Sequence, residues 1–493
     1  MTDVTIAPTR AVELVVHRLV QQLGPDAVIT DELRRRTYEC DGLTQHRSIP
    51  GVVVLPTNAE QVAATVAICV AYQVPFVARG AGTGLSAGAM PSSDGVLIVL
   101  TKLRAVIEVD LESRRVVVEP GVTNLEISEA VSASGYFYAP DPSSQQVCTI
   151  GGNVAENSGG AHCLKYGFTT NHVTGLKGVS GDGTPFAIGG KAPDPPGYDL
   201  LGAFVGSEGT LGIATEVTVR LVRKPETIVT LLAAFESIDL AGSAVSAVIA
   251  SGVLPAAIEM MDALAIEAVE VAVHANYPKA GAVLLIEIDG PADEVAIDRA
   301  LVEASLVAHH ATELRSAESA AERALLWKGR KSAFAAVGRI SPHFIVQDGV
   351  VPRTALGEVL AKIGKLTGDT GVRVANVFHA GDGNLHPLVL FDAAIEGQQA
   401  AAEEISAQII ALCVDHGGSI TGEHGVGLDK IGSISKMFTH DDLDTMQMIR
   451  CAFDPDRLSN PGKIFPTPRL CGEAPRVRRG DATGSGEALT GLF

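Results

Sequence analysis

The sequence predicts an α+β protein with more than one domain, and three observations support this class. A chain of 493 residues is long for one compact core and suggests roughly two to four domains. Apolar residues make up 46% and charged residues 19%, so the chain can bury a large interior. Short apolar runs typical of strands occur among helix-periodic segments, and the pattern changes near Ile228.

The first region combines strands, helices and loops. Apolar spacing predicts helical structure within residues 1–45, and Thr57 with Glu60 forms a capping-box signature before a helix that runs to Tyr72. Further patterns predict strands at 52–56, 75–80, 96–100 and 215–226, hairpins at 105–121 and 175–190, and a helix at 123–134. Residues 139–171 are rich in Gly, Asn and Ser and predict a long irregular stretch, which is usually functional.

Beyond Ile228, strands alternate with Ala-rich helices. The expected strands are 228–235, 253–259, 282–288 and 344–347, and the expected helices are 238–251, 262–273, 292–309 and 316–335. A hairpin at 372–391 and a helix at 398–416 follow. From Gly417 the chain is Gly-rich and then helical to about Pro466, and the tail 470–493 has the composition of a disordered segment.

Charge and cysteine content narrow the class of protein. The 38 basic and 57 acidic residues give a net charge of −19, which argues against a nucleic-acid binder, although a local Arg can still attract an anionic substrate. The seven cysteines are scattered and form no CxxC pair, so we expect reduced thiols in a cytoplasmic protein. The same absence of CxxC pairs argues against a Cys-ligated iron–sulfur cluster, so electrons from any redox reaction of this chain would pass to a partner, a carrier or oxygen.

The chain shows no pattern typical of a signal peptide or a membrane span. The N-terminus has an early acidic residue and lacks a basic segment followed by an apolar core. The longest uncharged stretch, residues 61–78, contains Gln, Thr and Pro and is better interpreted as a helix followed by a strand. We therefore expect no transmembrane segment.

A glycine-rich loop follows the strand expected at 75–80. In Arg79-Gly80-Ala81-Gly82-Thr83-Gly84 the glycines let backbone N–H groups approach a pyrophosphate without interference from Cβ atoms. A dinucleotide fingerprint of the GxGxxG type would open a helix, whereas the spacing here is GxGxG and no helical pattern follows. By itself, the loop also fits a simple glycine-rich turn.

Further motifs accompany this loop in a fixed order. They are Asp141-Pro142-Ser143-Ser144, the run Thr149-Ile150-Gly151-Gly152-Asn153-Val154-Ala155-Glu156-Asn157-Ser158-Gly159-Gly160, then Gly206-Ser207-Glu208-Gly209-Thr210-Leu211-Gly212-Ile213, and late in the chain Asn460-Pro461-Gly462-Lys463. The combination resembles the FAD-linked oxidase family typified by vanillyl-alcohol oxidase. The most similar branch contains glycolate oxidase FAD subunits, D-lactate dehydrogenases and D-2-hydroxyglutarate dehydrogenases. The resemblance covers about residues 45–466.

The resemblance implies a PCMH-type FAD-binding domain of two subdomains, an α+β substrate (cap) domain with an antiparallel sheet, and a C-terminal helical segment that returns to the FAD domain. We accordingly divide the chain into an N-terminal helical segment (1–45), the FAD-binding domain (46–226), the substrate domain (227–416), a completing segment (417–467) and a tail (468–493).

The resemblance also implies a set of FAD-binding residues: Arg79, Gly80, Ala81, Gly82, Thr83, Gly84, Asp141, Ser144, Thr149, Gly152, Asn153, Ala155, Asn157, Gly159, Glu208, Gly212, Ile213 and Asn460. Family members that tether FAD covalently use a His in the first glycine loop, where this chain has Thr83. We therefore expect non-covalent FAD. His162 lies in the second loop, where we expect a surface or structural role rather than a tether.

The segment 372–391 contains two histidines around an Asp382-Gly383 turn. A two-residue turn there pairs 381 with 384 and places His379 directly opposite His386, on one face and about 4.5–5.5 Å apart at Cβ. Two imidazoles so placed can share a cation, although an isolated pair also fits two partly exposed hairpin histidines.

A second motif, Thr421-Gly422-Glu423-His424-Gly425, favours the shared cation over two exposed histidines. Neighbouring side chains diverge in an extended segment, so Glu423 and His424 are unlikely to be ligands together. In the branch that this chain resembles, residues matching His379, His386 and Glu423 bind a divalent metal, and the residue matching His424 acts as base. Two His and one carboxylate suit Zn, Mn or Fe, and we expect Zn.

The same resemblance implies that the guanidinium of Arg330 binds the substrate carboxylate through two hydrogen bonds. The alternative is that residues 327–331 form a solvated basic face of a helix. Lys331 is expected at the surface. Some relatives carry a Lys shortly before the residue matching Asp348, where this chain has Ile345-Val346-Gln347. That departure favours glycolate, D-lactate or another monocarboxylate over a dicarboxylate such as 2-hydroxyglutarate.

The expected reaction is oxidation of a D-2-hydroxy acid to the 2-oxo acid by hydride transfer to flavin N5. The expected electron acceptor is an electron-transfer flavoprotein, an iron–sulfur partner subunit, a quinone or a cytochrome. We expect a cytoplasmic protein that binds a membrane only through such an acceptor. A homodimer is a further expectation. Three alternatives stay open: an alkyl-glycerone-phosphate-synthase-like flavoenzyme, a two-His-one-carboxylate metallohydrolase without flavin, and a non-catalytic flavin-binding subunit.

Overall fold

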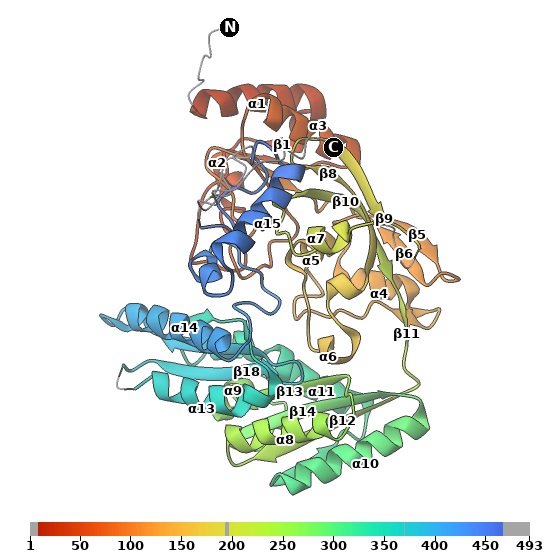
Figure 1. Ribbon diagram of the computed structural model, residues 1–493, viewed down its shortest axis with the longest axis vertical. Helices are drawn as coiled ribbons and strands as arrows, with labels where there is room; N and C mark the ends of the chain where they lie inside the picture. Colours follow the sequence, from red (N-terminus) through yellow and green to blue (C-terminus); the bar gives the residue numbers. More distant parts are fainter. Residues whose placement is uncertain (1–7, 193–196, 369, 467–493) are drawn as a thin grey trace, which may run out of the picture.

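The computed structural model describes residues 8–192, 197–368 and 370–466, which form two lobes (Figure 1). One lobe holds the N-terminal elements and the end of the chain, and the other holds the middle of the chain. Helices and strands are mixed in both lobes, so the predicted α+β class is confirmed. None of the described helices is both long and apolar enough to span a bilayer.

The first sheet has the order β1-β2-β4-β3 and consists of β1 (Val28–Ile29), β2 (Val52–Val54), β4 (Val96–Val99) and β3 (Phe76–Arg79). Strands β2 and β3 both run parallel to β4, and such strands are buried on both faces, which explains their continuous apolar runs. Helices α1 (Pro8–Leu23) and α3 (Ala59–Ala71) share an apolar core with this sheet, and the same lobe contains α2 (Glu32–Arg36) and the 3-10 turn η1 (Pro25–Ala27).

Helix α3 begins one residue later than the capping signature predicted. Its N-cap is Asn58, whose side chain accepts a hydrogen bond from the backbone of Gln61. The side chain of Gln61 in turn accepts from the backbone N–H of Thr57 at 2.8 Å. Asn is as good an N-cap as Thr or better, so the adjacent pair Asn58 and Gln61 took the role that Thr57 and Glu60 were expected to fill.

The second sheet is antiparallel, in the order β5-β6-β10-β8-β9. Its strands are β5 (Val106–Asp110), β6 (Arg115–Val118), β10 (Gly212–Arg220), β8 (Val173–Ser180) and β9 (Pro185–Gly189), while β7 (Tyr136–Phe137) pairs separately with β11 (Val222–Arg223). Helix α4 (Asn124–Ser132) begins with a complete capping box between Thr123 and Glu126, and α7 (Leu200–Phe204) covers the same lobe.

Residues 139–171 are less irregular than expected. They contain α5 (Ile150–Glu156), α6 (Cys163–Tyr166) and the 3-10 turn η2 (Thr169–Asn171). Helix α5 is capped by Thr149 and ends at Asn157 in the left-handed region. These helices are too short to show a 3.6-residue apolar period, and two glycines lower the helix propensity of α5, so the sequence pattern could not indicate them.

The third sheet is antiparallel and forms the second lobe, in the order β15-β12-β14-β13-β18-β19-β16 with β17 also paired to β19. Its strands are β12 (Thr227–Phe235), β13 (Ala257–Asp262), β14 (Ala282–Gly290), β15 (Glu313–Ser316), β16 (His343–Val346), β17 (Gly349–Val350), β18 (Arg373–His379) and β19 (Asn384–Phe391). The strand expected at 253–259 therefore begins only at Ala257, and the short strand β15 takes the start of the helix expected at 316–335.

Two apolar cores sandwich this sheet. One contains side chains of α8 (Ile238–Ala250), α10 (Ala292–Ala308), α13 (Leu356–Leu366), which follows the turn η3 (Arg353–Ala355), and α14 (Gln398–Asp415). The other contains side chains of α9 (Ala263–Val273), α11 (Ala320–Lys331) and α12 (Ala333–Val337).

The hairpin of β18 and β19 has a different register from the predicted one. His379 pairs with Asn384 and Val377 pairs with His386, because residues 380–383 form a four-residue connection instead of a two-residue turn. His379 and His386 are therefore diagonal neighbours rather than direct partners. The shift moves the pairing by two residues, and side chains alternate with period two, so both imidazoles still project from the same face.

The end of the chain returns to the first lobe, as expected. Helix α15 (His440–Phe453), preceded by η4 (Ile431–Lys436), lies beside the N-terminal elements (Figure 1). The backbone of Phe76 in β3 donates to Leu458 and accepts from Asn460. Cys451 is disulfide-bonded, which corrects the expectation that all seven cysteines are reduced. Spacing alone could not reveal a bond between cysteines outside a CxxC motif. The tail 470–493 lies outside the described residues.

Candidate active site

A cavity of 410 Å³ is lined by residues of both lobes. The predicted FAD-binding residues among its lining are Arg79, Gly80, Ala81, Gly82, Thr83, Gly84, Ser144, Thr149, Gly152, Asn153, Ala155, Glu208, Gly212 and Ile213. From the segments beyond Ile228, the lining includes His379, His386, Glu423 and His424. The structure thus brings the expected cofactor residues and the expected metal and base residues to one cavity.

The two glycine loops fit closely against each other. A Cβ atom on Gly80 would lie 2.2 Å from the hydroxyl oxygen of Thr149, which caps helix α5. Gly82 has φ +72°, and a Cβ atom there would collide with the guanidinium of Arg79. The wall is consequently built from backbone and small side chains, and it can admit a flat ring system or a pyrophosphate close to the main chain.

Four of the predicted FAD-binding residues do not line the cavity: Asp141, Asn157, Gly159 and Asn460. Asn460 donates from its side chain to the carbonyls of Gly88 and Glu208, and Asn157 accepts from the backbone of Thr170. Glu208 lines the cavity, but its carboxylate accepts from the backbone N–H groups of Val426 and Gly427 at 2.6 Å each. These side chains therefore fasten loops around the cavity, including the one that carries His424.

Glu423 lies between the two hairpin histidines. Its Oε1 atom is 3.2 Å from Nε2 of His379 and 3.2 Å from Nε2 of His386. The two imidazole rings are nearly perpendicular, with centroids 5.0 Å apart. Three ligand-type atoms from β18, β19 and the loop after α14 thus converge on one point.

Two buried carboxylates behind this cluster are residues that sequence reasoning did not select. Glu259 stands directly opposite His379 in the sheet and accepts from its Nδ1 at 2.8 Å. Asp348 has an oxygen 3.7 Å from Nδ1 of His386. Orienting carboxylates of this kind are typical of metal-binding histidines. The signal for Glu259 was an acidic residue inside the apolar part of strand β13, since acidic side chains are rarely fully buried without a partner.

Asp348 also organises the loop that carries Glu423 and His424. One of its oxygens, Oδ2, accepts from the hydroxyl of Thr421 at 2.6 Å and from the backbone of Gly422 and His424 at 2.9 Å. Lys430 adds an ammonium contact at 3.1 Å. Burial alone would raise the pKa of Asp348, but its neighbours His424, Lys430 and His386 hold that pKa far below its usual range.

His424 stacks on His386 with ring centroids 5.1 Å apart and an interplanar angle of 10°. Its Nδ1 lies 4.0 Å from Asp348, which leaves Nε2 for another partner. Burial lowers the pKa of His424 to about 4, so the imidazole is neutral at pH 7 and can accept a proton.

The donor set fits a divalent cation. Nδ1 of His379 must donate to Glu259, because a carboxylate only accepts, and a neutral ring then presents an unprotonated Nε2 toward Glu423. Two acceptors 3.2 Å apart require a shared positive charge, either a proton or a metal. Zn–N and Zn–O bonds in tetrahedral geometry separate neighbouring ligand atoms by about 3.3 Å. Without a metal, the positive charge is a proton: burial lowers the pKa of His379, but Glu259 and Glu423 raise it well above its usual value.

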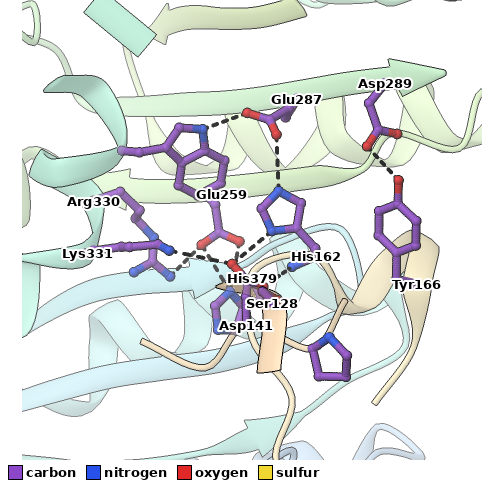
Figure 2. A network of polar contacts seen from close by, with 12 residues as sticks. Ser128, Asp141, His162, Tyr166, Glu259, Glu287, Asp289, Arg330, Lys331 and His379 are labelled. Atoms are coloured by element: carbon purple, nitrogen blue, oxygen red, sulfur yellow. Dashed lines mark hydrogen bonds and ion pairs between the residues drawn. The ribbon is translucent and has the colours of Figure 1, made fainter. Parts of the chain in front are cut away.

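Arg330 and Lys331 occupy positions opposite to those expected. The guanidinium of Arg330 is buried, does not belong to the cavity lining and pairs with Glu259 at 2.5 Å (Figure 2). Nε of Arg330 has no hydrogen-bond partner among the described residues, so its role as the carboxylate fork stays a prediction. Lys331, expected at the surface, is only partly exposed and lines the cavity. Successive residues of a helix point about 100° apart, so the last residue of α11 reaches the cavity while the preceding one does not.

One contact between the lobes is a polar network (Figure 2). Within it, His162 approaches Asp141 through Nδ1 at 2.9 Å and Glu287 through Nε2 at 3.2 Å. Glu287 also accepts from Trp327 at 2.7 Å and from Arg323 at 2.8 and 2.9 Å. His162 therefore connects the second glycine loop to the third sheet, which is a structural position.

Comparison with known proteins gives matches over nearly the whole chain. Residues 50–189 match the model of an FAD binding domain, and residues 224–464 match the model of FAD linked oxidases, C-terminal domain. The glycolate oxidase subunit GlcD of Escherichia coli K12 is 51% identical over 437 residues, which cover 88% of each chain. The mitochondrial D-lactate dehydrogenase [cytochrome] of Arabidopsis thaliana is 30% identical over 95% of this chain and 85% of its own. Among solved structures, p-cresol methylhydroxylase has the same fold, with a TM-score of 0.76 and 15% identity over 92% of this chain and 96% of its own.

Proposed function

The chain belongs to the FAD-linked oxidases, and from this premise we propose that it oxidises a small D-2-hydroxy acid, such as glycolate or D-lactate, to the 2-oxo acid. The observation that carries the proposal is the convergence of His379, His386, Glu423 and His424 on the cavity that the glycine loops line. The relatives named as a glycolate oxidase subunit and a D-lactate dehydrogenase support this substrate class.

Each group has a distinct task in the proposed reaction. FAD supplies a hydride acceptor when bound, and a divalent metal, which we expect to be Zn, supplies a Lewis acid for the substrate oxygen. His379, His386 and Glu423 hold the cation, and Glu259 and Asp348 orient the two imidazoles. His424 receives the hydroxyl proton at Nε2, because its Nδ1 faces Asp348. Asp348 keeps the loop of His424 in place through three backbone hydrogen bonds.

FAD is held without a covalent bond in this proposal. The first glycine loop offers Thr83 where a tethering relative has a histidine, and both ring nitrogens of His162 contact carboxylates. Residues 46–226 serve as the FAD-binding domain and 227–416 as the substrate domain. Residues 417–467 complete the active site, because they contribute Glu423 and His424 to it and Asn460 to the first lobe.

The electrons leave to a separate acceptor, for which an electron-transfer flavoprotein, an iron–sulfur partner subunit, a quinone and a cytochrome are the candidate classes. D-2-Hydroxyglutarate is the less favoured substrate, because residues 345–347 lack the Lys expected for a second carboxylate. An alkyl-glycerone-phosphate-synthase-like reaction is less favoured because it involves no net oxidation and has no use for a metal hairpin.

Anaerobic reduction of the bound flavin tests the proposal. Purified protein is mixed with glycolate, D-lactate, L-lactate or D-2-hydroxyglutarate, and flavin absorbance is followed. We expect rapid bleaching by glycolate or D-lactate and slower bleaching by L-lactate. If none of these acids bleaches the flavin in metal-loaded protein, the proposed substrate class is wrong.

A further inference from the structure

Glu156, the last residue of α5, is an acidic residue of the cavity wall that the proposed reaction does not use. The side chain is partly exposed, and its Oε2 atom is buried without a hydrogen-bond partner among the described residues. Buried charged oxygens are normally hydrogen-bonded, because an unpaired buried charge is costly. The placement of Glu156 therefore raises the question of whether its carboxyl group is charged at all.

The carboxyl group of Glu156 lies between the segment after the first glycine loop and the loop that carries His424. A Cβ atom on Gly88 would lie 2.6 Å from its Oε1 atom, and a Cβ atom on Gly425 would lie 2.1 Å from its Oε2 atom. Glycine at both positions gives the carboxyl group its space. Glu156 thus stands where the FAD-binding wall meets the loop of the proposed base.

A second carboxyl group approaches the same point. The Cβ position of Gly425 lies 2.9 Å from Oε1 of Glu208, so the carboxyl groups of Glu156 and Glu208 are close neighbours. Glu208 accepts from the backbone N–H groups of Val426 and Gly427 at 2.6 Å each, and such donors favour the charged form. Two neighbouring carboxyl groups resist ionising together. Glu156, which lacks those donors, is consequently the member of the pair that keeps its proton.

The cations near this pair are engaged elsewhere. Lys430 contacts Oδ2 of Asp348 at 3.1 Å. Lys463 donates to a backbone carbonyl at 3.2 Å, and Arg79 donates to another at 2.7 Å. These contacts hold the three cations at other acceptors, so none of them compensates a charge on Glu156.

A third acidic residue, Asp41, lies close by. A Cβ atom on Gly84 would lie 3.8 Å from Oδ2 of Asp41 and 3.8 Å from Oε1 of Glu156. Burial raises the pKa of Glu156 well above its usual value, and the acidic neighbours Glu208 and Asp41 raise it further, although a lysine lowers it. The described groups whose ligand atoms converge closely enough for a metal do not include these three acids. A proton rather than a metal therefore neutralises Glu156.

We infer that Glu156 is a neutral carboxylic acid that donates a hydrogen bond to the FAD held in this cavity and so makes the flavin easier to reduce. Glu156 belongs to the second glycine motif and not to the cap side, so its donor serves the cofactor rather than the substrate. A flavin that accepts a hydride gains a negative charge, which a fixed donor stabilises and an ionised carboxylate would oppose. The inference rests on the FAD binding of the proposed function, and not on the identity of the hydroxy acid.

The equilibrium between oxidised and reduced flavin in the FAD-loaded protein tests this inference. Each protein is reduced at pH 7 by a chemical reductant beside a reference dye, and the two absorbances give the equilibrium constant for flavin reduction. Glu156→Gln keeps a neutral donor, and Glu156→Leu removes it. Glu129→Gln, an exposed change on α4, is the matched control. Thermal unfolding and the Kd of FAD for the apoprotein establish that each variant is intact.

For Glu156→Leu we expect the equilibrium to shift toward oxidised flavin by about 3- to 10-fold, the usual net effect of one hydrogen bond. Glu156→Gln and Glu129→Gln should match the parent, because an amide is neutral and still donates. The reduced-minus-oxidised infrared spectrum of the parent should contain a C=O band of a protonated carboxyl group that is missing in Glu156→Gln.

A shift of Glu156→Gln toward reduced flavin would reveal an ionised Glu156 and overturn the inference. An unchanged equilibrium in intact Glu156→Leu would also overturn it, as would a parent spectrum without the carboxyl band. If Glu156→Leu does not fold, Glu156→Ala decides the same question. Failure of the proposed function is a separate outcome, in which the parent is reduced by the chemical reductant but by no 2-hydroxy acid.

Discussion

Nδ1 of His379 donates to Glu259 at 2.8 Å, while Nε2 of the same ring faces Glu423 at 3.2 Å. The two residues stand opposite each other on adjacent strands, β13 and β18, so the sheet itself fixes the direction of the imidazole. Glu259 is fully buried and is neutralised by Arg330 on its other side. Three residues thus form a chain that fixes the orientation of one of the proposed metal ligands.

Replacing Glu259 by Gln should weaken metal binding without removing any proposed ligand. An amide can still accept from His379, but it no longer compensates Arg330 or makes the ring more basic, and such changes cost about 10- to 100-fold in metal affinity. Titration of metal-free protein with Zn²⁺ measures the effect. Glu313→Gln, an exposed change on β15, is the control. Equal zinc affinities for Glu259→Gln and the parent would mean that Glu259 does not support the site.

Replacing His424 by Ala should slow flavin reduction by about 10²- to 10⁴-fold, the usual contribution of a general base. FAD content and zinc affinity should be unchanged, because His424 contacts neither the glycine loops nor Glu423 in the hydrogen bonds of the described chain. Stopped-flow absorbance measures the rate, and His343→Ala, an exposed histidine of β16, serves as control. A normal reduction rate would exclude His424 as the base.

The network between the lobes should give a stability that depends on pH. Burial alone would lower the pKa of His162, but Asp141 and Glu287 raise it to about 10. The contribution of His162 to the free energy of unfolding is therefore complete below about pH 6.5 and is lost as the pH rises through 10. Burial alone would raise the pKa of Glu287, but His162 and Arg323 lower it to about 2. The contribution of Glu287 to the free energy of unfolding is therefore complete above about pH 4.5 and is lost as the pH falls through 2. We expect maximal stability from these groups at pH 4.5–6.5.

Thermal or denaturant unfolding of the parent and of His162→Gln as a function of pH measures this contribution. The variant should be less stable at pH 6 by a few kcal/mol, on the order of one kcal/mol per unit of pKa shift, and the difference should shrink toward pH 10. A difference that stays constant between pH 6 and 10 would show that His162 contributes packing rather than charge.

The cofactor should leave the protein when it unfolds. Acid precipitation of the yellow protein should release FAD into the supernatant, since Thr83 stands at the position of the tethering histidine and both ring nitrogens of His162 contact carboxylates. Absorbance at the flavin maximum in supernatant and pellet gives the distribution. Flavin retained in the pellet after washing would contradict non-covalent binding.

Local sequence signals predicted the outline of this molecule and much of its cavity. Strands β2, β3 and β4 consist largely of apolar residues, and the glycines of residues 80–84 allow close approach to the backbone. Both features can be predicted from the local sequence without knowledge of tertiary contacts. The face shared by His379 and His386 was also predicted, because alternation along a strand tolerates a register error of two residues.

The remaining features depend on partners that are distant in sequence. Glu259 in β13 and Asp348, the residue before β17, are acidic residues whose importance appears only when the folded sheet places them behind the imidazoles. The exchange of positions between Arg330 and Lys331 depends on the rotation of α11 against the sheet, and one residue changes direction by about 100° on a helix. Cys451 likewise gave no local sign of its disulfide.

Flavin reduction with and without metal tests the central claim most directly. Protein is stripped with a chelator, its metal content and FAD content are measured, and D-lactate or glycolate is added anaerobically before and after Zn²⁺ or Mn²⁺ is restored. If His379, His386 and Glu423 hold a cation that the reaction requires, the stripped enzyme should keep its FAD yet bleach very slowly, and added metal should restore the rate. Full-speed bleaching in verified metal-free protein would contradict the claim.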